Sequence, residues 1–397
     1  MIDSSVRDWF PQLRQGLVYL DSAASTLKPV QVVEAMSRFL LYGYSNVHRG
    51  SYRWAVEASE RYEKARESVA GFIGASWREV VFTSGATAGL WRAFMLAYVN
   101  DIIREDCRVI VPLDAHHSLL LAAARVAGLA RARLTLLPLT GEGTPDWGRL
   151  DDLLPEACLL AVGHVSNVTG AVAPLQRISR LARRHGVILL VDAAQSVPHM
   201  PVEAGLVDML AFSGHKMLGP TGVGVLYINR RLAERLEPDQ PGGGTVASVR
   251  LRDGLPSPEW EEPPWRFEAG TPPIAEAVGL AEAVGLLERL GMENVMDHDI
   301  RLAEAIVEGL ETIEGARVLG PSEGRLGIVS FTIRGIAPDL VAHLLARRGV
   351  AVRAGMHCAQ PLHEALGYNM GSVRASTYVY NTMGEVEEFI KALKSIV

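Results

Sequence analysis

The stretch Val187-Ile188-Leu189-Leu190-Val191-Asp192 decides the fold, because five consecutive apolar residues run directly into an acid. Short uninterrupted apolar runs are typical of strands that are buried on both faces of a parallel sheet. Other runs of this kind are Glu79–Thr83, Arg108–Pro112, Cys158–Gly163, Asp208–Phe212 and Val223–Ile228. Amphipathic stretches lie between several of them, such as Ile178–His185, which Gly186 closes. This alternation predicts a doubly wound α/β sheet.

The length of 397 residues predicts two domains, since one hydrophobic core rarely serves so long a chain. The Pro- and Gly-rich stretch Pro238–Pro273 is expected to be a long irregular connection. The chain ends in a helix that the capping-box pattern Thr382-Met383-Gly384-Glu385 announces. We predict a large domain over residues 16–288. A smaller α+β domain is predicted over residues 289–397 and also includes residues 1–15.

The composition excludes several classes of protein. A net charge of -6 argues against nonspecific nucleic-acid binding, which requires a basic surface. The first residues contain no apolar signal-peptide core, and the apolar runs are too short to span a membrane. Three cysteines, Cys107, Cys158 and Cys358, do not resemble a disulfide framework and indicate a reducing environment. We therefore expect a cytoplasmic protein with no membrane or nucleic-acid partner.

Polar residues follow the apolar runs, at the edge where open α/β sheets bind ligands. Phe82–Gly89 is a turn of small residues before a helix, which suits a phosphate but is also a common structural turn. The two histidines of Asp114-Ala115-His116-His117 could bind a metal, stack on a ring or lie at the surface. No nearby residue has zinc-type spacing, so no metal is predicted. His164-Val165-Ser166-Asn167 could bind a ligand or form an Asx turn.

Two further residues, Asp192 and Lys216, indicate a single function for these segments. Asp192 ends an apolar strand, so its carboxylate needs a partner such as a protonated pyridine nitrogen, unless it caps a helix. Lys216 lies in the turn-forming segment Ser213-Gly214-His215-Lys216 after a strand. Most lysines are solvated, but a lysine amine forms Schiff bases when its surroundings lower its pKa. A phosphate turn, an acid and an amine at one edge are the groups that pyridoxal 5'-phosphate (PLP) requires. The sequence therefore predicts a PLP enzyme with its cofactor on Lys216.

The chain resembles the class V, fold-type I PLP enzymes, and most closely the group II cysteine desulfurases, also called selenocysteine lyases. The resemblance spans nearly the whole chain. It rests on Tyr19-Leu20-Asp21-Ser22-Ala23-Ala24, Val47-His48-Arg49-Gly50, His164-Val165-Ser166-Asn167, Phe212-Ser213-Gly214-His215-Lys216, Arg266-Phe267-Glu268-Ala269-Gly270-Thr271-Pro272 and Gly355-Met356-His357-Cys358-Ala359. It implies an α/β fold with a large, mainly parallel seven-stranded sheet and a smaller α+β domain, assembled as a homodimer.

The resemblance also implies a role for each matching residue. Lys216 would hold PLP as a Schiff base, Asp192 would face the pyridine nitrogen, and Gln195 would face the phenolic oxygen. His116 would stack on the ring and assist proton transfer. The groups expected on the phosphate are the N–H of Ala86, Thr87, Ser213, His215 and, from the neighbouring subunit, Thr271.

The substrate site is predicted around an arginine. Arg374 would bind the substrate carboxylate, a task that suits a bidentate guanidinium. Asn167 would contact the phenolic oxygen or the substrate. Arg353 and His48 are expected in the same pocket with less defined roles.

Cys358 distinguishes the subfamilies. A single cysteine is commonly a buried small hydrophobe. The segment Arg353–Pro361 instead indicates a loop, in which Arg353 and His357 could favour the thiolate. Cys107 and Cys158 adjoin strand runs and are interpreted as structural.

The resemblance implies the reaction of a PLP-dependent sulfurtransferase. L-cysteine would replace Lys216 on the cofactor, Cys358 would attack the substrate sulfur, and alanine would leave while Cys358 keeps a persulfide. A separate sulfur-acceptor protein would then take the sulfur for iron–sulfur clusters or other products. The alternatives are a selenocysteine lyase, a class V enzyme that acts on another amino acid by transamination or epimerisation, and a scaffold without activity.

The sequence departs from the family pattern in four places. Met356 replaces a frequent histidine, and Ala88 replaces an acidic residue after Thr87. The segments Ser118-Leu119 and Ser51-Tyr52-Arg53-Trp54 also differ from the usual residues. These departures leave the substrate preference and the docking of the acceptor open.

Overall fold

A computed structural model, which describes residues 2–397, contains the predicted α/β sheet. Seven strands lie in the order β2-β8-β7-β6-β5-β3-β4. Their bounds are β2 (Val80–Thr83), β3 (Arg108–Pro112), β4 (Arg133–Leu137), β5 (Ala157–Gly163), β6 (Ile188–Asp192), β7 (Met209–Ser213) and β8 (Gly224–Ile228). Neighbouring strands are parallel except at β8, which runs antiparallel to β2 and β7. The prediction of a mainly parallel seven-stranded sheet is confirmed.

Every apolar run that was predicted to be a strand is a strand of this sheet, with bounds that differ by one residue at most. The strand β4 was not predicted. It lies at the sheet edge, and Arg133 and Leu136 are exposed. Because an edge strand need not be apolar on both faces, β4 lacks the continuous run that marks the others.

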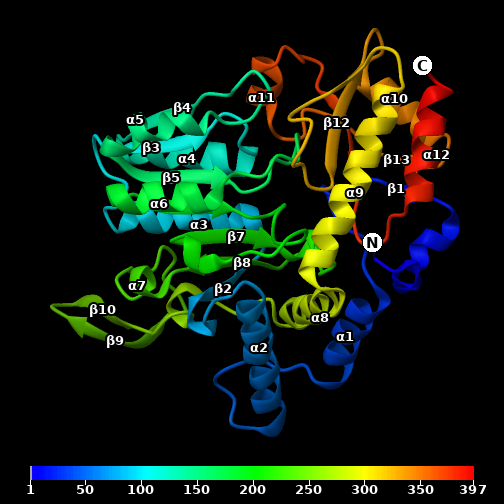
Figure 1. Cartoon of the computed structure of the whole chain (residues 1–397). Helices are drawn as coiled ribbons and strands as arrows, with labels where there is room; N and C mark the ends of the chain where they lie inside the picture. Colours follow the sequence, from blue (N-terminus) through cyan, green and yellow to red (C-terminus); the bar gives the residue numbers. More distant parts are fainter. Residues whose placement is uncertain (1) are drawn as a thin grey trace.

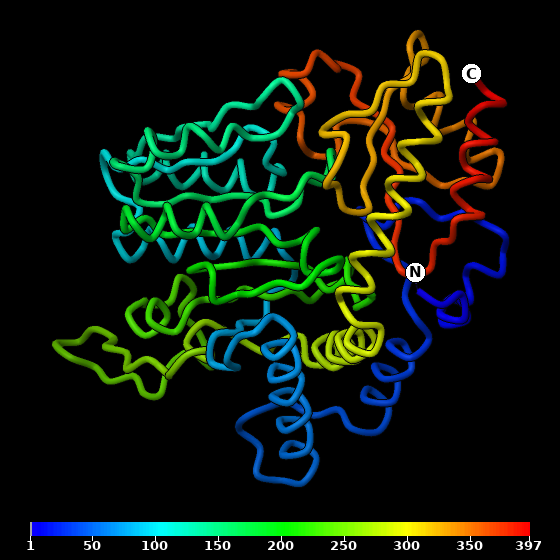
Figure 2. Tube along the Cα trace, in the orientation of Figure 1, coloured from blue at the N-terminus to red at the C-terminus, as the bar shows by residue number. Residues whose placement is uncertain are grey.

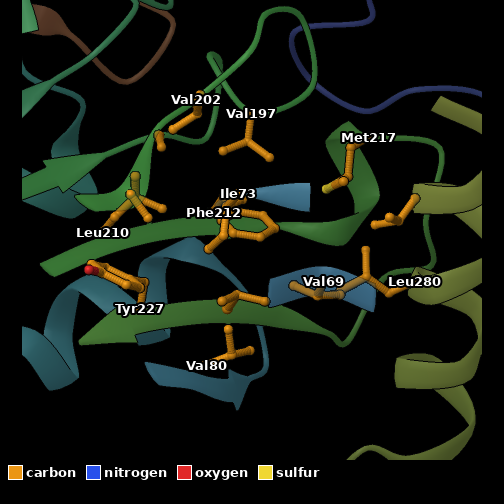
Figure 3. Close-up of a cluster of buried hydrophobic side chains, with 14 of the residues drawn as sticks. Val69, Ile73, Val80, Val197, Val202, Leu210, Phe212, Met217, Tyr227 and Leu280 are labelled. Atoms are coloured by element: carbon orange, nitrogen blue, oxygen red, sulfur yellow. The ribbon is translucent and has the colours of Figure 1, made fainter. Parts of the chain in front are cut away.

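Helices cover both faces of the sheet (Figure 1). The helices of this part are α1 (Val30–Tyr42), α2 (Arg53–Phe72), α3 (Ala86–Val99), α4 (His117–Ala130), α5 (Leu150–Leu153), α6 (Leu175–His185), α7 (Arg230–Ala233) and α8 (Ile274–Leu290). One core layer joins α3 and α4 to the sheet, and the other joins α2, α6 and α8 to it. Figure 3 shows part of the second layer, where Phe212 of β7 and Tyr227 of β8 lie among Val69 and Leu280. Both layers together bury the sheet and leave its strand ends to form a site.

A second, antiparallel sheet has the order β11-β12-β15-β14. Its strands and the helices near it are β11 (Ala316–Val318), β12 (Ile328–Ile333), β14 (Arg353–Gly355), β15 (Ser372–Ser376), α9 (Met292–Glu311), α10 (Pro338–Ala346), α11 (Gln360–Ala365) and α12 (Met383–Lys394). The predicted capping box is present, with Thr382 and Glu385 each bonding the other's backbone. The smaller α+β unit is therefore confirmed, while its limits at residues 289–397 stay a prediction.

The N-terminal segment lies beside the smaller unit, as Figure 2 shows for the blue and red ends of the chain. The strand β1 (Val18–Tyr19) pairs in parallel with β13 (Val350–Ala351). Arg7 forms a 2.8 Å ion pair with Glu385 of α12. These contacts hold the start of the chain against its end.

The connection predicted over Pro238–Pro273 is not irregular throughout. Its middle forms a hairpin of β9 (Val246–Arg252) and β10 (Leu255–Trp260), which projects from the body in Figure 1. Asp253 and Gly254 at its tip both have positive φ, 51° and 79°. Two such residues are typical of a type I′ turn, for which Asp-Gly is a strong sequence signal. The Asp-Gly pair was thus the overlooked signal for this hairpin.

Cys107 and Cys158 form a disulfide, with their Cα atoms 5.8 Å apart. Cys107 immediately precedes β3, and Cys158 lies in its parallel neighbour β5. The expectation that the cysteines form no disulfide is therefore wrong for this pair, although the interpretation of both as structural agrees with it. An odd cysteine count cannot reveal the pairing, because only the sheet brings the two residues together. Cys358 is a free thiol.

Candidate active site

A cavity of about 480 Å³ opens where the parallel strands end, between the sheet and the smaller unit. Residues that follow β2, β3, β5, β6 and β7 line it, together with residues of the Cys358 segment and β15. The predicted residues that line it are Ala86, Thr87, His116, Asn167, Asp192, Gln195, Ser213, His215, Lys216, Arg353, Cys358 and Arg374. The sheet edge thus brings together groups that the sequence spreads over most of the chain.

The turn after β2 forms one end of the cavity. The N–H of Ala86, at the start of α3, donates to Ser213 Oγ at 2.7 Å. Gly224 lets this turn approach β8, because a Cβ at that position would lie 2.5 Å from Gly85 Cα. The Thr87 and Ser118 hydroxyls lie 2.8 Å apart. Small side chains, hydroxyls and a helix N-terminus make this end suitable for a phosphate.

Asp192 and Lys216 lie in the cavity wall. Burial raises the pKa of the Asp192 carboxyl, and the N–H of Ala194 opposes this shift by donating to Oδ1 at 3.0 Å. Burial lowers the pKa of Lys216 to about 8, against the attraction of Asp192. Among the described residues, no cation lies within ion-pair distance of Asp192. The site therefore holds a buried acid and an amine that titrates near physiological pH.

His116 and Gln195 complete the wall. Burial, and then the charge of Lys216, lowers the pKa of His116 to about 4, so its ring is neutral at pH 7. Its Nδ1 accepts from the N–H of Ser118 at 3.1 Å, which fixes the ring as the N-cap of α4. Gln195 donates from Nε2 to the Ala23 carbonyl at 2.8 Å, while its Oε1 is buried without a partner. A neutral imidazole and an unsatisfied amide oxygen both face a prospective ligand.

Two arginines lie on the opposite side of the cavity. Arg374 is only 3% exposed, and its Nη1 donates to the Asn167 carbonyl at 2.9 Å while its Nε has no partner. Burial lowers the pKa of Arg374 to about 10, which leaves it charged at pH 7. Arg353 makes a bidentate pair with Asp21 at 2.8 and 3.1 Å. Asp21 also lies 3.6 Å from Arg374, so one carboxylate orients both cations.

The loop predicted over Arg353–Pro361 is confined to Met356–Ala359, because Arg353–Gly355 form β14 and α11 begins at Gln360. His357 and Cys358 both have positive φ, 48° and 55°, which is uncommon for residues other than glycine. The Asn167 amide donates to the His357 carbonyl at 2.6 Å, and the N–H of His117 donates to the Cys358 carbonyl at 2.7 Å. These bonds hold an exposed thiol at the rim of the cavity.

The structure corrects the expected role of His357. Burial lowers the pKa of its ring to about 3, so the imidazole is neutral and supplies no positive charge to a thiolate. Its Nε2 contacts the Ser372 carbonyl at 3.0 Å, so the ring supports the loop. Arg353 and Arg374, which remain charged at pH 7, line the same cavity as Cys358.

Two predicted residues do not reach this cavity in their own chain. His48 and Thr271 line a separate cavity of about 700 Å³. His48 Nε2 lies 2.7 Å from Glu63 Oε1 there. Thr271 was predicted to act on a neighbouring subunit, whereas His48 was expected in the same pocket as Arg374. His164, from a predicted polar segment, faces α6 instead and lines a third hollow.

Sequence reasoning missed two groups of residues. Asp114 lines the cavity, and burial raises the pKa of its carboxyl to about 7. Its segment was noted only for its histidines, although a carboxylate at a strand end was the signal that identified Asp192. The second group, Ser25, Thr26 and Lys28, contacts the His215 backbone from a distant part of the chain, and no local pattern marks it.

Comparison with known proteins agrees with this geometry. Residues 18–389 match the family model described as Aminotransferase class-V. A probable cysteine desulfurase of Aeropyrum pernix is 50% identical over 98% of this chain and 97% of that protein. A cysteine desulfurase of Haloferax volcanii is 40% identical over 95% of this chain and 88% of that one. The apo structure of a cysteine desulfurase from Thermococcus onnurineus has a TM-score of 0.94 at 38% identity, covering 100% of this chain and 98% of its own. The chain therefore belongs to the class V aminotransferase family.

Proposed function

We propose that this PLP-dependent cysteine desulfurase transfers the sulfur of L-cysteine to Cys358 and releases L-alanine. The observation that carries the proposal is an exposed thiol at the rim of a cavity whose wall holds Lys216 and Asp192. A thiol in this position faces the same cavity that would receive the substrate. A plain transaminase would need no such thiol.

The described residues fit PLP. The Ala86 turn, Ser213 and His215 suit its phosphate, and Asp192 lacks the counter-charge that a protonated pyridine nitrogen would supply. Gln195 Oε1 is buried without a partner and suits the polar edge of the ring. Lys216 would hold PLP, which would supply an electron sink that favours loss of the Cα proton of the substrate.

The remaining steps belong to side chains of this chain. The Arg374 guanidinium, charged and desolvated, binds the substrate carboxylate, and Arg353 adds a second positive charge beside it. The Lys216 amine, with its pKa near 8, takes and returns the proton at Cα. His116, neutral at pH 7, accepts the Ser118 N–H at Nδ1, so its hydrogen resides on Nε2, which can donate to a bound group.

Sulfur transfer follows at the cavity rim. The Cys358 thiolate attacks the substrate sulfur, an S–S bond forms, and the bond between Cβ and sulfur breaks. The electron pair of that bond stays with the carbon skeleton, which takes a proton at Cβ and leaves as alanine. Arg353 lines the same cavity as Cys358.

The persulfide then passes to a separate acceptor protein that serves iron–sulfur cluster assembly or other sulfur metabolism. The exposed position of Cys358 supports delivery to a partner without opening the cavity. We also propose a homodimer. Thr271 and His48 lie outside the Lys216 cavity of their own chain, and in the dimer they would contribute to the active site of the neighbouring subunit. A cytoplasmic location is part of the proposal. Over residues 2–397, no helix is both long and apolar enough to cross a bilayer.

The test is to incubate the holoenzyme with L-cysteine and a reductant and to measure alanine and sulfide. Equal amounts of the two products are expected. Cys358→Ala should keep the visible absorption band of the bound cofactor and lose most sulfide formation, whereas Lys216→Ala should lose the band itself. Turnover of L-selenocysteine in parallel, with no alanine or sulfide from L-cysteine, would contradict the proposal and favour a selenocysteine lyase.

A further inference from the structure

The chain contains only five lysines among its 39 basic residues: Lys28, Lys64, Lys216, Lys391 and Lys394. Lys64, Lys391 and Lys394 are exposed on helices. Lys28 lies in the partly buried segment before α1 and reaches the turn that carries Lys216. Burial lowers the pKa of Lys28 to about 7. The position of a desolvated lysine beside the Lys216 turn therefore requires an explanation other than protein solubility.

Lys28 contacts one backbone oxygen, the carbonyl of His215. Its Nζ lies 2.7 Å from this oxygen. The N–H of Thr26 donates to the same oxygen at 3.1 Å, and the hydroxyls of Thr26 and Ser25 lie 3.1 and 3.2 Å from it. A carbonyl oxygen has two lone pairs, so four donors compete for it. The ammonium makes the shortest contact and is the only charged donor, which makes it the strongest.

The competition among these four donors determines which atom accepts the hydrogen of the Ser25 hydroxyl. The Ser25 hydroxyl lies 3.2 Å from both the His215 carbonyl and His215 Nδ1, and it has one hydrogen to donate. With Lys28 and the Thr26 N–H on the carbonyl, the Ser25 hydrogen is free for Nδ1. The pKa of His215 is lowered to about 4, first by burial, so its ring is neutral and carries one hydrogen. If Nδ1 accepts from Ser25, that hydrogen resides on Nε2.

Lys28 also lacks a counter-ion within the protein. In the described part of the chain, no carboxylate lies within 4 Å of its Nζ, and Thr26 Oγ1 at 3.3 Å is its second contact. A partly buried cation without a carboxylate is stabilised by a nearby anion. His215 lines the cavity, whereas Lys28 does not.

We propose that Lys28 is a positioning residue for the phosphate group of PLP. It holds the His215 carbonyl, which leaves the Ser25 hydrogen for Nδ1 and fixes the tautomer of His215 that donates from Nε2. Its charge adds to the field that favours the phosphate dianion. This role rests on PLP as the cofactor and not on the chemistry of Cys358.

The experiment compares PLP with pyridoxal, which lacks the phosphate. Holoenzyme is dialysed against graded concentrations of either compound, and half-occupancy is read from the visible absorption band. Lys28→Met should raise the half-occupancy concentration of PLP about tenfold, since one charged interaction is lost, and should change that of pyridoxal less than twofold. The exposed control Lys391→Met should change neither.

Ser25→Ala provides a second variant that leaves every charge in place. It should weaken PLP and spare pyridoxal in the same way, because His215 loses the donor that fixes its tautomer. Equal weakening of both compounds by Lys28→Met would overturn the proposal, because Lys28 would then act on the turn as a whole. Unchanged PLP affinity in both variants would overturn it as well. The proposed function is tested separately on the native holoenzyme: PLP binding without sulfide formation from L-cysteine would count against Cys358 and not against Lys28.

Discussion

Replacement of Arg374 by methionine tests the substrate site most sharply. The guanidinium is 3% exposed and is held by the Asn167 carbonyl and by Asp21 at 3.6 Å. With its pKa near 10, it is fully charged at pH 8. A substrate carboxylate that accepts two hydrogen bonds from it would gain about 1.5–3 kcal/mol from each.

The lower end of that range, roughly 3 kcal/mol in total, corresponds to a loss on the order of 10²-fold in affinity. The assay uses L-alanine, the product, and ethylamine, which is alanine without its carboxylate. Both are titrated into holoenzyme, and binding is followed by the change in the visible absorption band. The native protein should bind L-alanine on the order of 10²-fold more tightly than ethylamine, and Arg374→Met should abolish that difference.

The exposed Arg347 provides a matched control, since Arg347→Met removes an arginine without touching the cavity. It should leave both affinities unchanged. If Arg374→Met weakens L-alanine and ethylamine equally, Arg374 supports the fold of the cavity and does not bind the carboxylate. The reasoning from burial and the unpaired Nε would then be refuted.

Three other predictions follow from particular contacts. The rate constant kcat should rise with pH, with a midpoint near pH 8, because protonated Lys216 cannot accept the Cα proton; Asp192→Asn should move the midpoint to lower pH, since Asp192 raises the Lys216 pKa, and a flat profile would contradict this role. Titration of the denatured protein with a thiol reagent should find one free thiol before reduction and three after it, and three thiols without reduction would refute the disulfide. The double variant Cys107→Ser/Cys158→Ser should lower the free energy of unfolding by up to about 4 kcal/mol, which is the loop-closure value for a separation of 51 residues. Glu268→Ala should lower the free energy of unfolding in urea by about 1–3 kcal/mol, because the fully buried Arg66 loses its contacts at 2.7 and 2.9 Å while it keeps its ion pair with Glu63; no measurable loss would show that Glu63 alone satisfies Arg66.

The sheet was predictable because its strands are buried on both faces. Continuous apolar runs such as Ile188–Val191 need no knowledge of neighbours, and polar residues at or after the ends of the parallel strands mark one edge of the sheet. Asp192, Lys216 and the Phe82–Gly89 turn therefore met as expected. The edge strand β4 and the hairpin β9–β10 were not predicted. One face of each is exposed, so neither contains a continuous apolar run.

Other features depend on contacts between distant segments. The disulfide between Cys107 and Cys158 exists because β3 and β5 are neighbours, which the order of the strands along the chain does not state. Lys28 reaches the His215 carbonyl across 187 positions of sequence. The neutral state of His357 depends on its burial against β15, and its sequence position beside Cys358 suggested the opposite. Such contacts follow from tertiary packing and have no local signature.

The most direct test of the account is the location of the transferred sulfur. Holoenzyme is mixed with one equivalent of L-cysteine in the absence of reductant, quenched, digested, and analysed by mass spectrometry. We predict the added mass of one sulfur atom on the peptide that contains Cys358, with alanine in equal amount, and no added sulfur in Lys216→Ala. Alanine and sulfide formed by Cys358→Ala at the native rate, or added sulfur confined to other peptides, would contradict the account.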